Sequence, residues 1–499
     1  MEINLAGMNI DHSLLQDTIR LLRRAADCLT QEKPNLQENR RVADAIFALL
    51  DADSMTPETL SAAYARISRD PRSVDQLREE SRYRVGKARR SNRTIIFGLG
   101  HASVAEHAVF NLDVIGISRY LSEYIQSHRL GSYTEKSQRY IRLDSDYTIP
   151  PELIGTPLSR DFEQFIQRRF DDYHALCRII EKELDSAEPD VAGEDARYVL
   201  PLAVTTQMGM TVNARTLERI LQRAASSGLQ EFQEWGRRVF SVIDGIAPSI
   251  IKYTAHSDRQ TAIETALRSY QSREKPDPTA PGIRPPVQLV SVTPDGDRRV
   301  VEALLAGLSG QSIGETHESF LDDPAIRRQI FLDVFREMEP WDPPPREFEL
   351  ADAQFELLIS AAAYAQLKRH RMVTLRPGPY DPRLDITIPP VLKEGRGEVI
   401  LRSAAAESAA IAHRMMCQAP LAAPYAFLAC HRRRIIMKVN ARELIHLSRL
   451  REDVHAQWDI REIVTAMVTL ARAQLPGCMI AACGKHAFEA YRQSLGISS

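Results

Sequence analysis

The sequence has few cysteines, no excess of charge and no long apolar run, and each absence excludes a class of protein. Its 499 residues include six cysteines without a CxxC pair, which argues against structural zinc and a disulfide framework. The 64 Lys and Arg nearly balance the 66 Asp and Glu, which argues against a general electrostatic grip on nucleic acid or anionic lipid. An anionic ligand would therefore be held by a local arginine cluster.

Segments that cross or enter membranes are also missing from the sequence. No apolar run approaches the roughly 18 residues that span a bilayer, and the first residues lack the basic and apolar parts of a secretory signal. We therefore expect a cytoplasmic protein without a membrane segment, and the histidine and cysteine spacings suggest no metal site. At 44% hydrophobic residues, the chain can bury the cores of roughly two to four domains.

Helical periodicity is the main pattern that the sequence does contain. Apolar residues recur at spacings of three and four over 37–50 and 158–186, as in amphipathic helices. Strand-like runs are few and short, such as 287–293 and 385–388. Residues 272–286 (SREKPDPTAPGIRPP) replace periodicity with proline, glycine and charge, which is typical of a linker. These patterns predict an α+β fold, rich in helix and divided near its middle.

An internal repeat relates the two sides of this linker. Three segments recur in the same order: 118–129 with 360–371, 148–151 with 387–390, and 212–215 with 439–442. The offsets are 242, 239 and 227 residues, so the order is kept while the loops shorten. One match could arise by chance, whereas three in order indicate a duplication. We expect domains at 51–271 and 287–499, preceded by a helical extension over 1–50 that packs on the first half.

The repeated segments resemble the flavin-dependent thymidylate synthases. In the first half, the resemblance lies in HASVAEH (101–107) and EKSQRY (135–140). In the second half, it lies in QLKRHR (366–371) and VNARELIHLSRLREDVHAQWDIR (439–461). It covers about 50–270 and 287–499 and implies two tandem domains of that family's fold, each a small sheet flanked by long helices.

The two halves depart from the family's pattern in complementary ways. The first half keeps the loop 135–140 but has Tyr124 and Ser127 where the family has glutamine and arginine. The second half keeps Gln366 and the Arg-His-Arg after it, but has lost the loop. A further family arginine survives as Arg197 and is replaced in the second half. Because family sites take residues from more than one chain, we expect each site here to be built from both halves.

By resemblance, the expected site residues form three groups. The substrate-binding group is Glu135, Ser137, Arg139, Arg197, Gln366 and Arg369. The flavin-binding group is Ser103, Glu106, His370, Arg371, Asn440, Arg442 and His446. The catalytic residue is Arg451, since a cation beside uracil stabilises the N3-deprotonated ring.

The resemblance implies reductive methylation of dUMP or a related pyrimidine nucleotide, with FAD as cofactor and NADPH and methylenetetrahydrofolate as cosubstrates. Two alternatives stay open: a flavin-dependent one-carbon transferase acting on a different nucleotide, and a non-catalytic homologue that binds flavin or nucleotide. Family members form tetramers of single domains. A chain with two domains is therefore expected to form a homodimer of about 113 kDa, twice the 56.3 kDa chain, that mimics the tetramer.

Overall fold

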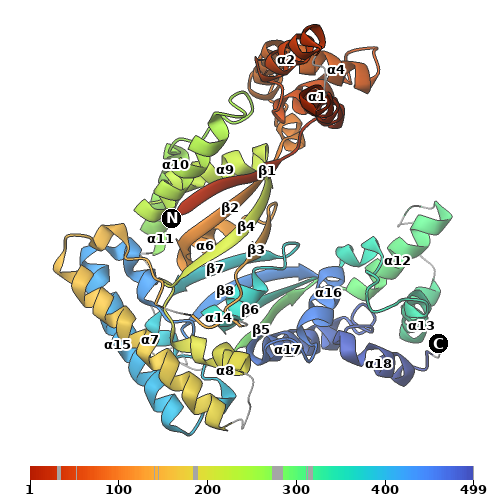
Figure 1. Cartoon of the computed structure of the whole chain (residues 1–499). Coiled ribbons are helices and arrows are strands. Elements are labelled where there is room, and N and C mark those ends of the chain that lie inside the picture. Colours follow the sequence, from red (N-terminus) through yellow and green to blue (C-terminus); the bar gives the residue numbers. More distant parts are fainter. Residues whose placement is uncertain are drawn as a thin grey trace. The chain divides into compact units, whose positions relative to one another are not determined.

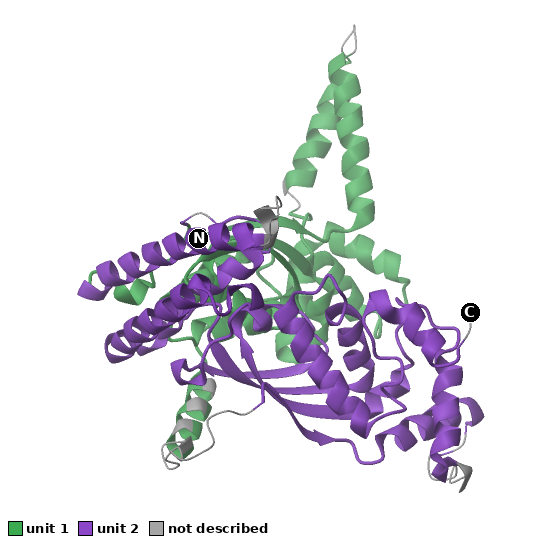
Figure 2. Cartoon of the chain, turned by 90° about the horizontal axis from the view of Figure 1, so that it is seen from below, with its two compact units in different colours: residues 1–137, 146–156, 203–275 green, residues 138–145, 157–202, 276–499 purple. Residues whose placement is uncertain are grey.

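The chain forms two compact units, each built around one sheet. The computed structural model describes residues 1–30, 35–51, 53–139, 141–143, 145–183, 189–271, 285–310, 312 and 319–497 (Figure 1). Unit 1 comprises Met1–Ser137, Asp146–Thr156 and Ala203–Lys275, and unit 2 comprises Gln138–Ser145, Pro157–Leu202 and Pro276–Ser499 (Figure 2). Most of the expected linker, 272–284, lies outside the described residues.

The two sheets have the same topology. Each is antiparallel, and the strand orders are β1-β2-β4-β3 and β5-β6-β8-β7. The strands are β1 (Glu2–Met8), β2 (Val109–Ser118), β3 (Ser132–Glu135), β4 (Thr205–Asn213), β5 (Val287–Val292), β6 (Asp352–Ser360), β7 (Thr374–Tyr380) and β8 (Arg432–Asn440). The repeated strand order confirms the prediction of an α+β chain with tandem copies of one fold.

Helices make up most of the remaining structure. Those of unit 1 are α1 (His12–Thr30), α2 (Leu36–Asp51), α3 (Glu58–Arg66), α4 (Val74–Tyr83), α5 (Val85–Asn92), α6 (Arg119–Gln126), α9 (Ala214–Ala225), α10 (Gln230–Asp244) and α11 (Asp258–Gln271). Those of unit 2 are α7 (Pro157–Glu183), α8 (Pro189–Ala196), α12 (Gly296–Ser309), α13 (Pro324–Phe335), α14 (Ala361–Leu367), α15 (Arg396–Gln418), α16 (Ala441–Arg451), α17 (Trp458–Gln474) and α18 (Phe488–Ser494). None of the described helices is long and apolar enough to cross a membrane.

Short 3-10 and π segments join these elements. They are η1 (Arg93–Gly98), η2 (Ala102–His107), η3 (Pro151–Leu153), η4 (Arg197–Val199), η5 (Ser319–Asp322), η6 (Arg346–Leu350), η7 (Pro382–Leu384), η8 (Pro390–Leu392), η9 (Pro420–Ala426) and η10 (Lys485–Ala487). Among them, η1 is the π-helical segment.

Equivalent residues of the repeat have equivalent structural roles. The side chains of Ser118 and Ser360 each accept a hydrogen bond from the backbone three residues on, which caps α6 and α14. Asn213 and Asn440 cap α9 and α16 in the same way. The repeat read from the sequence is thus also a repeat of local structure.

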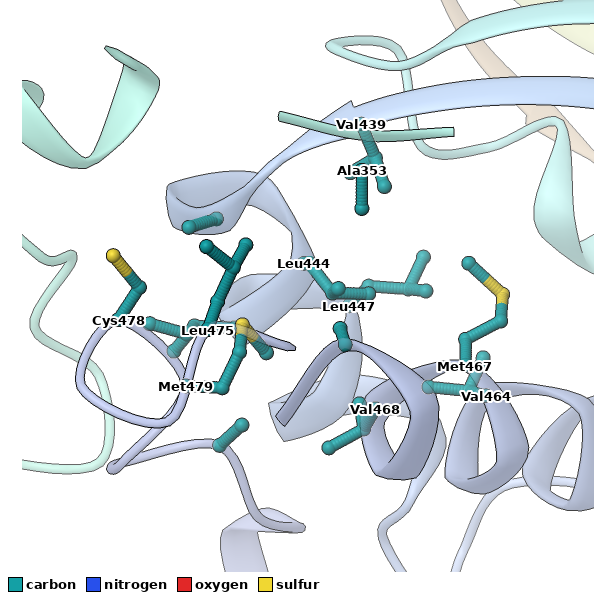
Figure 3. Packing of buried hydrophobic residues seen from close by; sticks show 14 of the residues in the cluster. Ala353, Val439, Leu444, Leu447, Val464, Met467, Val468, Leu475, Cys478 and Met479 are labelled. Atoms are coloured by element: carbon teal, nitrogen blue, oxygen red, sulfur yellow. The ribbon is translucent and has the colours of Figure 1, made fainter. Parts of the chain in front are cut away.

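Alternating burial along the strands sets one face of each sheet against helices. In both β4 and β8 buried and exposed residues alternate, as expected when one face is covered. In unit 2, leucines and valines of α16 and α17 converge on an interior shared with Ala353 of β6 and Val439 of β8 (Figure 3). This packing fixes α16, and with it the arginine at its end.

Two sequence expectations were wrong at the level of single elements. Residues 385–388 form no strand; Ile386 makes one isolated bridge to His431, because Asp385 has a left-handed φ of 61° and two prolines follow. The 1–50 extension is not wholly helical, since β1 pairs with β2 as an edge strand. The helices expected at 37–50 and 158–186 are confirmed as α2 and α7, although 184–188 lie outside the described residues, and β5 confirms the strand at 287–293.

Repeat boundaries and packing boundaries do not coincide. The segments 138–145 and 157–202 belong to the first repeat by sequence but pack within unit 2. Helix α7 lies against α15, where Arg169 pairs with Glu407 at 2.7 Å and Arg414 pairs with Asp161. Unit 2 therefore contains residues of both repeats, which is what brings them into one site.

Candidate functional site

The site begins at the carboxyl end of β6. The hydroxyl of Ser360, the cap of α14, also donates a hydrogen bond to Oδ2 of Asp459 at 2.5 Å. Helix α14 has seven residues, and the Arg-His-Arg lies just beyond it. His370 is buried, whereas Arg369 and Arg371 are exposed. The turn thus holds an imidazole in the interior between two solvent-facing guanidinium groups.

The guanidinium of Arg451, the last residue of α16, contacts this histidine. Its Nε donates to Nε2 of His370 at 3.0 Å, and its Nη2 donates to the backbone oxygen of Gln366 at 3.4 Å. A guanidinium can only donate, so Nε2 of His370 is the acceptor and the ring proton is assigned to Nδ1, which lies 3.5 Å from Glu443. Burial lowers the pKa of His370, although Glu443 opposes this. A neutral His370 therefore orients Arg451.

Three arginines gather here with little negative charge to balance them. Burial, followed by the charges of Arg369 and Arg139, lowers the pKa of Arg451 to about 10. Arg139 pairs with Glu194 at 2.8 Å and donates to the backbone oxygen of His455 at 3.2 Å. Among the described residues, neither Arg369 nor Arg451 forms an ion pair with a carboxylate. Such an excess of guanidinium groups suits a phosphate.

A buried hydrogen-bond chain leads inward from Gln366. Its Nε2 donates to Oε1 of Gln457 at 3.0 Å, and Nε2 of Gln457 donates to the hydroxyl of Tyr198 at 2.8 Å. That hydroxyl donates to Asp459 at 2.9 Å. Burial raises the pKa of Asp459, which the hydrogen bonds from Ser360 and Tyr198 counter. The chain holds the Gln366 amide in one orientation.

The first repeat supplies part of this cluster through unit 2. Trp458 stacks on Tyr198 with ring centroids 5.8 Å apart, and its Nε1 donates to Asp195 at 2.8 Å. Burial raises the pKa of Asp195 to about 6. Arg197 is buried on η4, and its Nε donates to the backbone oxygen of Glu194 at 2.9 Å. The expected residues Arg139, Gln366, Arg369 and Arg451 therefore meet in one unit, with Arg197 on the adjoining segment.

The other expected substrate residues lie in unit 1 and are described there alone. Glu135 is buried at the end of β3, where its carboxylate accepts from Gln126 at 2.7 Å and pairs with Arg119 at 3.2 Å. Ser137 is the last residue of the first segment of unit 1. Along the chain, Ser137 lies two residues before Arg139.

The expected flavin residues are divided between the units in the same manner. Ser103 and Glu106 lie on η2 of unit 1, and Glu106 pairs with Arg215 at 2.5 Å. In unit 2 the equivalent pair joins Glu349 to Arg442 at 3.2 Å. Because the same ion pair occurs in both repeats, it also has a structural role: it links a 3-10 segment, η2 or η6, to the first turn of a helix, α9 or α16.

The remaining flavin residues lie on α16, at its start, and on the turn that holds His370. His446, exposed on α16, meets the His370 ring edge-on at 6.0 Å, and Arg371 is exposed on the turn. Asn440 uses its side-chain oxygen to cap α16. This set is rich in cationic and imidazole donors, which fits the diphosphate and ring carbonyls of FAD. The described residues contain no group of three His, Cys, Asp or Glu that could hold a metal ion.

Sequence reasoning missed the supporting roles of Tyr198, Glu194, Glu443 and Asp459. One signal could have identified Asp459. It is the second residue of α17, and its equivalent in the first repeat, Glu231, is the second residue of α10 and accepts from the Ser118 hydroxyl at 2.7 Å. A serine cap and an acidic residue at a helix start thus recur together in both repeats.

Comparison with known proteins accounts for both repeats. The thymidylate synthase complementing protein family matches residues 48–249 and 288–477. The flavin-dependent thymidylate synthase of Clostridium tetani is 31% identical over 212 residues, covering 40% of this chain and 83% of that protein. The same enzyme of Geobacter sulfurreducens is 33% identical over 205 residues, covering 39% of this chain and 81% of that protein.

A solved structure is more distantly similar. It is a UMP/dUMP methylase of Streptomyces cacaoi bound with 5-Br dUMP, at 18% identity and a TM-score of 0.31, covering 39% of this chain and 92% of that one. The similarity extends over about two fifths of the present chain. The family match, by contrast, extends over most of the chain on both sides of the linker, and the chain therefore belongs to the thymidylate synthase complementing protein family, that of the flavin-dependent thymidylate synthases.

Proposed function

We propose that this chain is a flavin-dependent, thymidylate synthase-like enzyme that reductively methylates dUMP or a related pyrimidine nucleotide. The observation that carries the proposal is the grouping of Arg139, Arg369 and Arg451, of which, among the described residues, Arg139 alone pairs with a carboxylate, that of Glu194. The resulting excess of positive charge favours a dianionic phosphate. Family membership supplies the class of reaction, and the arginines supply a site for its substrate.

In the proposed complex, Arg139 and Arg369 bind the nucleotide phosphate from opposite repeats, with Arg197 as a further ligand. Arg451 lies beside the pyrimidine, where its charge stabilises the ring deprotonated at N3. Its guanidinium is held for this role by the neutral His370. The Gln366 amide, fixed through Gln457, is positioned to bind the pyrimidine edge.

FAD is the proposed cofactor, NADPH the reductant and methylenetetrahydrofolate the one-carbon donor. A bound flavin supplies the reducing equivalents that a transferred methylene group needs to become a methyl group. Arg371, His446 and Asn440 would hold it in unit 2, beside His370. Arg442 would join them only after its ion pair with Glu349 opens. Glu135, Ser137, Ser103 and Glu106 are proposed contributions of unit 1.

The test starts with the absorbance spectrum of the purified chain and continues with turnover. We expect a yellow protein with bound FAD, NADPH oxidation stimulated by dUMP, and dTMP formation when methylenetetrahydrofolate is added. FAD binding without a response to dUMP would favour one-carbon transfer to another nucleotide. A protein that binds no flavin would refute the proposal and favour a non-catalytic homologue.

A matched pair of variants separates the two flavin environments. Arg371→Ala should lower FAD occupancy, because Arg371 belongs to the second Arg-His-Arg. Arg129→Ala changes the equivalent arginine of the first repeat and should have a smaller effect. Equal losses of FAD in the two variants would mean that both repeats hold the cofactor.

A further inference from the structure

The helical hairpin α1–α2 has an apolar face that nothing in the described residues of unit 1 covers. The two helices pack together and are anchored at their base by Asp11, which pairs with Arg78 at 3.1 Å and with Arg82 at 3.6 Å (Figure 2). Six large apolar side chains on them are exposed, by 39% to 85%: Leu15, Leu22, Leu29, Leu36, Phe47 and Leu50. The hairpin lies almost entirely before residue 48, where the family match begins.

The exposed residues follow the spacing of a coiled-coil seam. On α1 they are Leu15, Leu22 and Leu29, with Ile19 and Ala26 between them, so the spacing alternates between four and three residues. A second stripe on the same helix, displaced by one residue toward the N-terminus at each position, includes the buried Leu14 and Cys28. Helix α1 therefore has two adjacent apolar seams, of which one is buried and one is open.

Helix α2 repeats this arrangement. Its buried residue is Val42, and the stripe one residue later contains Ala43, Phe47 and Leu50 together with Leu36. In two antiparallel helices that share an interior, stripes displaced in the same direction along the sequence turn to the same side of the hairpin. The open seams of α1 and α2 thus form one continuous face.

We propose that this face binds the same face of a second copy of the chain, so that two hairpins form a four-helix bundle. A two-fold axis along the helices would set α1 of one copy against α2 of the other, as in an isologous interface. Each hairpin presents on the order of 500 Å² that a copy could cover, so the pair would bury about 1,000 Å², which reaches the lower limit for a specific interface.

Charge complementarity favours a second copy as the partner. Among the residues that flank the open seams on the outer side are Arg23 on α1 and Asp44 on α2, both exposed. Arg23 lies roughly 11 Å along the helix from the last residue of α1, and Asp44 lies roughly 12 Å from the first residue of α2, at 1.5 Å per residue. The two-fold arrangement therefore brings Arg23 of one copy beside Asp44 of the other. Within the described part of the chain, neither residue forms an ion pair.

The test is a disulfide between copies, because Arg23 and Asp44 of one chain lie on opposite edges of the hairpin. The full-length Arg23→Cys/Asp44→Cys variant should form a covalent dimer on mild oxidation, seen on a non-reducing gel. The wild type and each single variant control for the exposed Cys417. A double variant that gives no more covalent dimer than these controls overturns the proposal.

A second measurement does not depend on disulfide geometry. Leu22→Gln should weaken self-association in sedimentation velocity at least tenfold, whereas Leu308→Gln, at a leucine 88% exposed on α12, should not. Arg23→Glu and Asp44→Arg should each weaken association, and the two together should restore it. Unchanged association in Leu22→Gln, or no recovery on charge exchange, would assign the face to a different protein.

Discussion

The two repeats place different chemistry on the same backbone. Tyr124 of α6 occupies the position that Gln366 occupies in α14. The Tyr124 ring packs on Phe232 with centroids 4.7 Å apart, and its hydroxyl donates to the backbone oxygen of Ile220 at 3.3 Å. Gln366 instead bonds to the amide of Gln457. An aromatic contact in the first repeat thus replaces the polar chain of the second.

His128 and His370, the equivalent histidines of the two repeats, also differ in their hydrogen-bond partners. Nδ1 of His128 lies 3.1 Å from the backbone oxygen of Tyr124, and its buried Nε2 has no partner among the described residues. Nε2 of His370 accepts from Arg451. At these two positions the first repeat uses its side chains for packing, whereas the second places its glutamine and histidine in contact with Arg451.

The strongest test of this division is the arginine at the end of α16. Arg451→Ala should lower turnover by roughly 10²–10³-fold, as loss of one positioned electrostatic donor does, while NADPH still reduces the flavin. Arg451→Lys should restore only part of the rate, because an ammonium lacks the planar fork. Arg223→Ala, which removes the arginine near His128, should leave turnover intact. Equal losses of turnover in Arg451→Ala and Arg223→Ala would contradict a functional difference between the two repeats.

Lowering the pH should reduce the free energy of unfolding, because His128 of the first repeat is buried. Burial, followed by the charge of Arg223, lowers the pKa of His128 to about 4, against about 6.5 in an unfolded chain. Between these values the unfolded state binds more protons, so the stability that His128 contributes is complete above about 6.5 and is lost as pH falls toward 4. The loss is on the order of 2–3 kcal/mol.

Denaturant unfolding of wild type and His128→Gln at pH 7 and pH 4.5 measures this contribution. The variant should lose less stability between the two pH values, with turnover unchanged at pH 7. His431 of unit 2, whose pKa burial also lowers to about 4, should keep its own acid sensitivity in both proteins. Identical pH dependence of the two proteins would mean that His128 does not titrate as described.

The next largest effect is expected on the affinity for the nucleotide, which we propose is bound by arginines of both repeats. Arg139→Ala and Arg369→Ala should each weaken binding of dUMP by about 1.5–3 kcal/mol, the range for a charged hydrogen bond. Calorimetric titration would show this as roughly a 10- to 150-fold rise in Kd. Arg129→Ala, in the first repeat, serves as the control. Binding that responds to only one of the two arginines would refute a site shared by both repeats.

The smallest effect is expected at Tyr124, where an aromatic packing contact stands in place of the hydrogen bond that Gln366 makes in the second repeat. Tyr124→Gln restores the residue type of the second repeat but removes the ring contacts with Phe232 and His128. It should lower the free energy of unfolding by about 1.5 kcal/mol, with no loss of turnover. A stable Tyr124→Gln variant would show that the aromatic contacts contribute little to the fold.

Sequence reasoning reached the repeat and the fold class because both depend on local patterns, whereas the roles of the arginines stay predictions. The order of the matched segments could be read from residue types alone, although the helix-capping roles of Ser118 and Ser360 were not predicted. It could not reveal that 157–202 pack with the second repeat, because helix periodicity identifies an apolar face but not its partner. For the same reason Tyr198 and Asp459, which meet across 261 residues, were not predicted as partners.

The assignment of α7 and α8 to unit 2 bears on how the chain is made. Helices α7 and α8 leave the ribosome about 200 residues ahead of α15. At a synthesis rate of roughly 5–20 residues per second, they exist for roughly 10–40 seconds before α15 is made. During that time α7 can pack on α8 and η4, which are made directly after it, but not on α15. A gene split at the linker would place α7 and α15 on separate chains, and their contact would then have to form between two products. The packing of α7 against α15 thus couples the folding of the first repeat to the synthesis of the second.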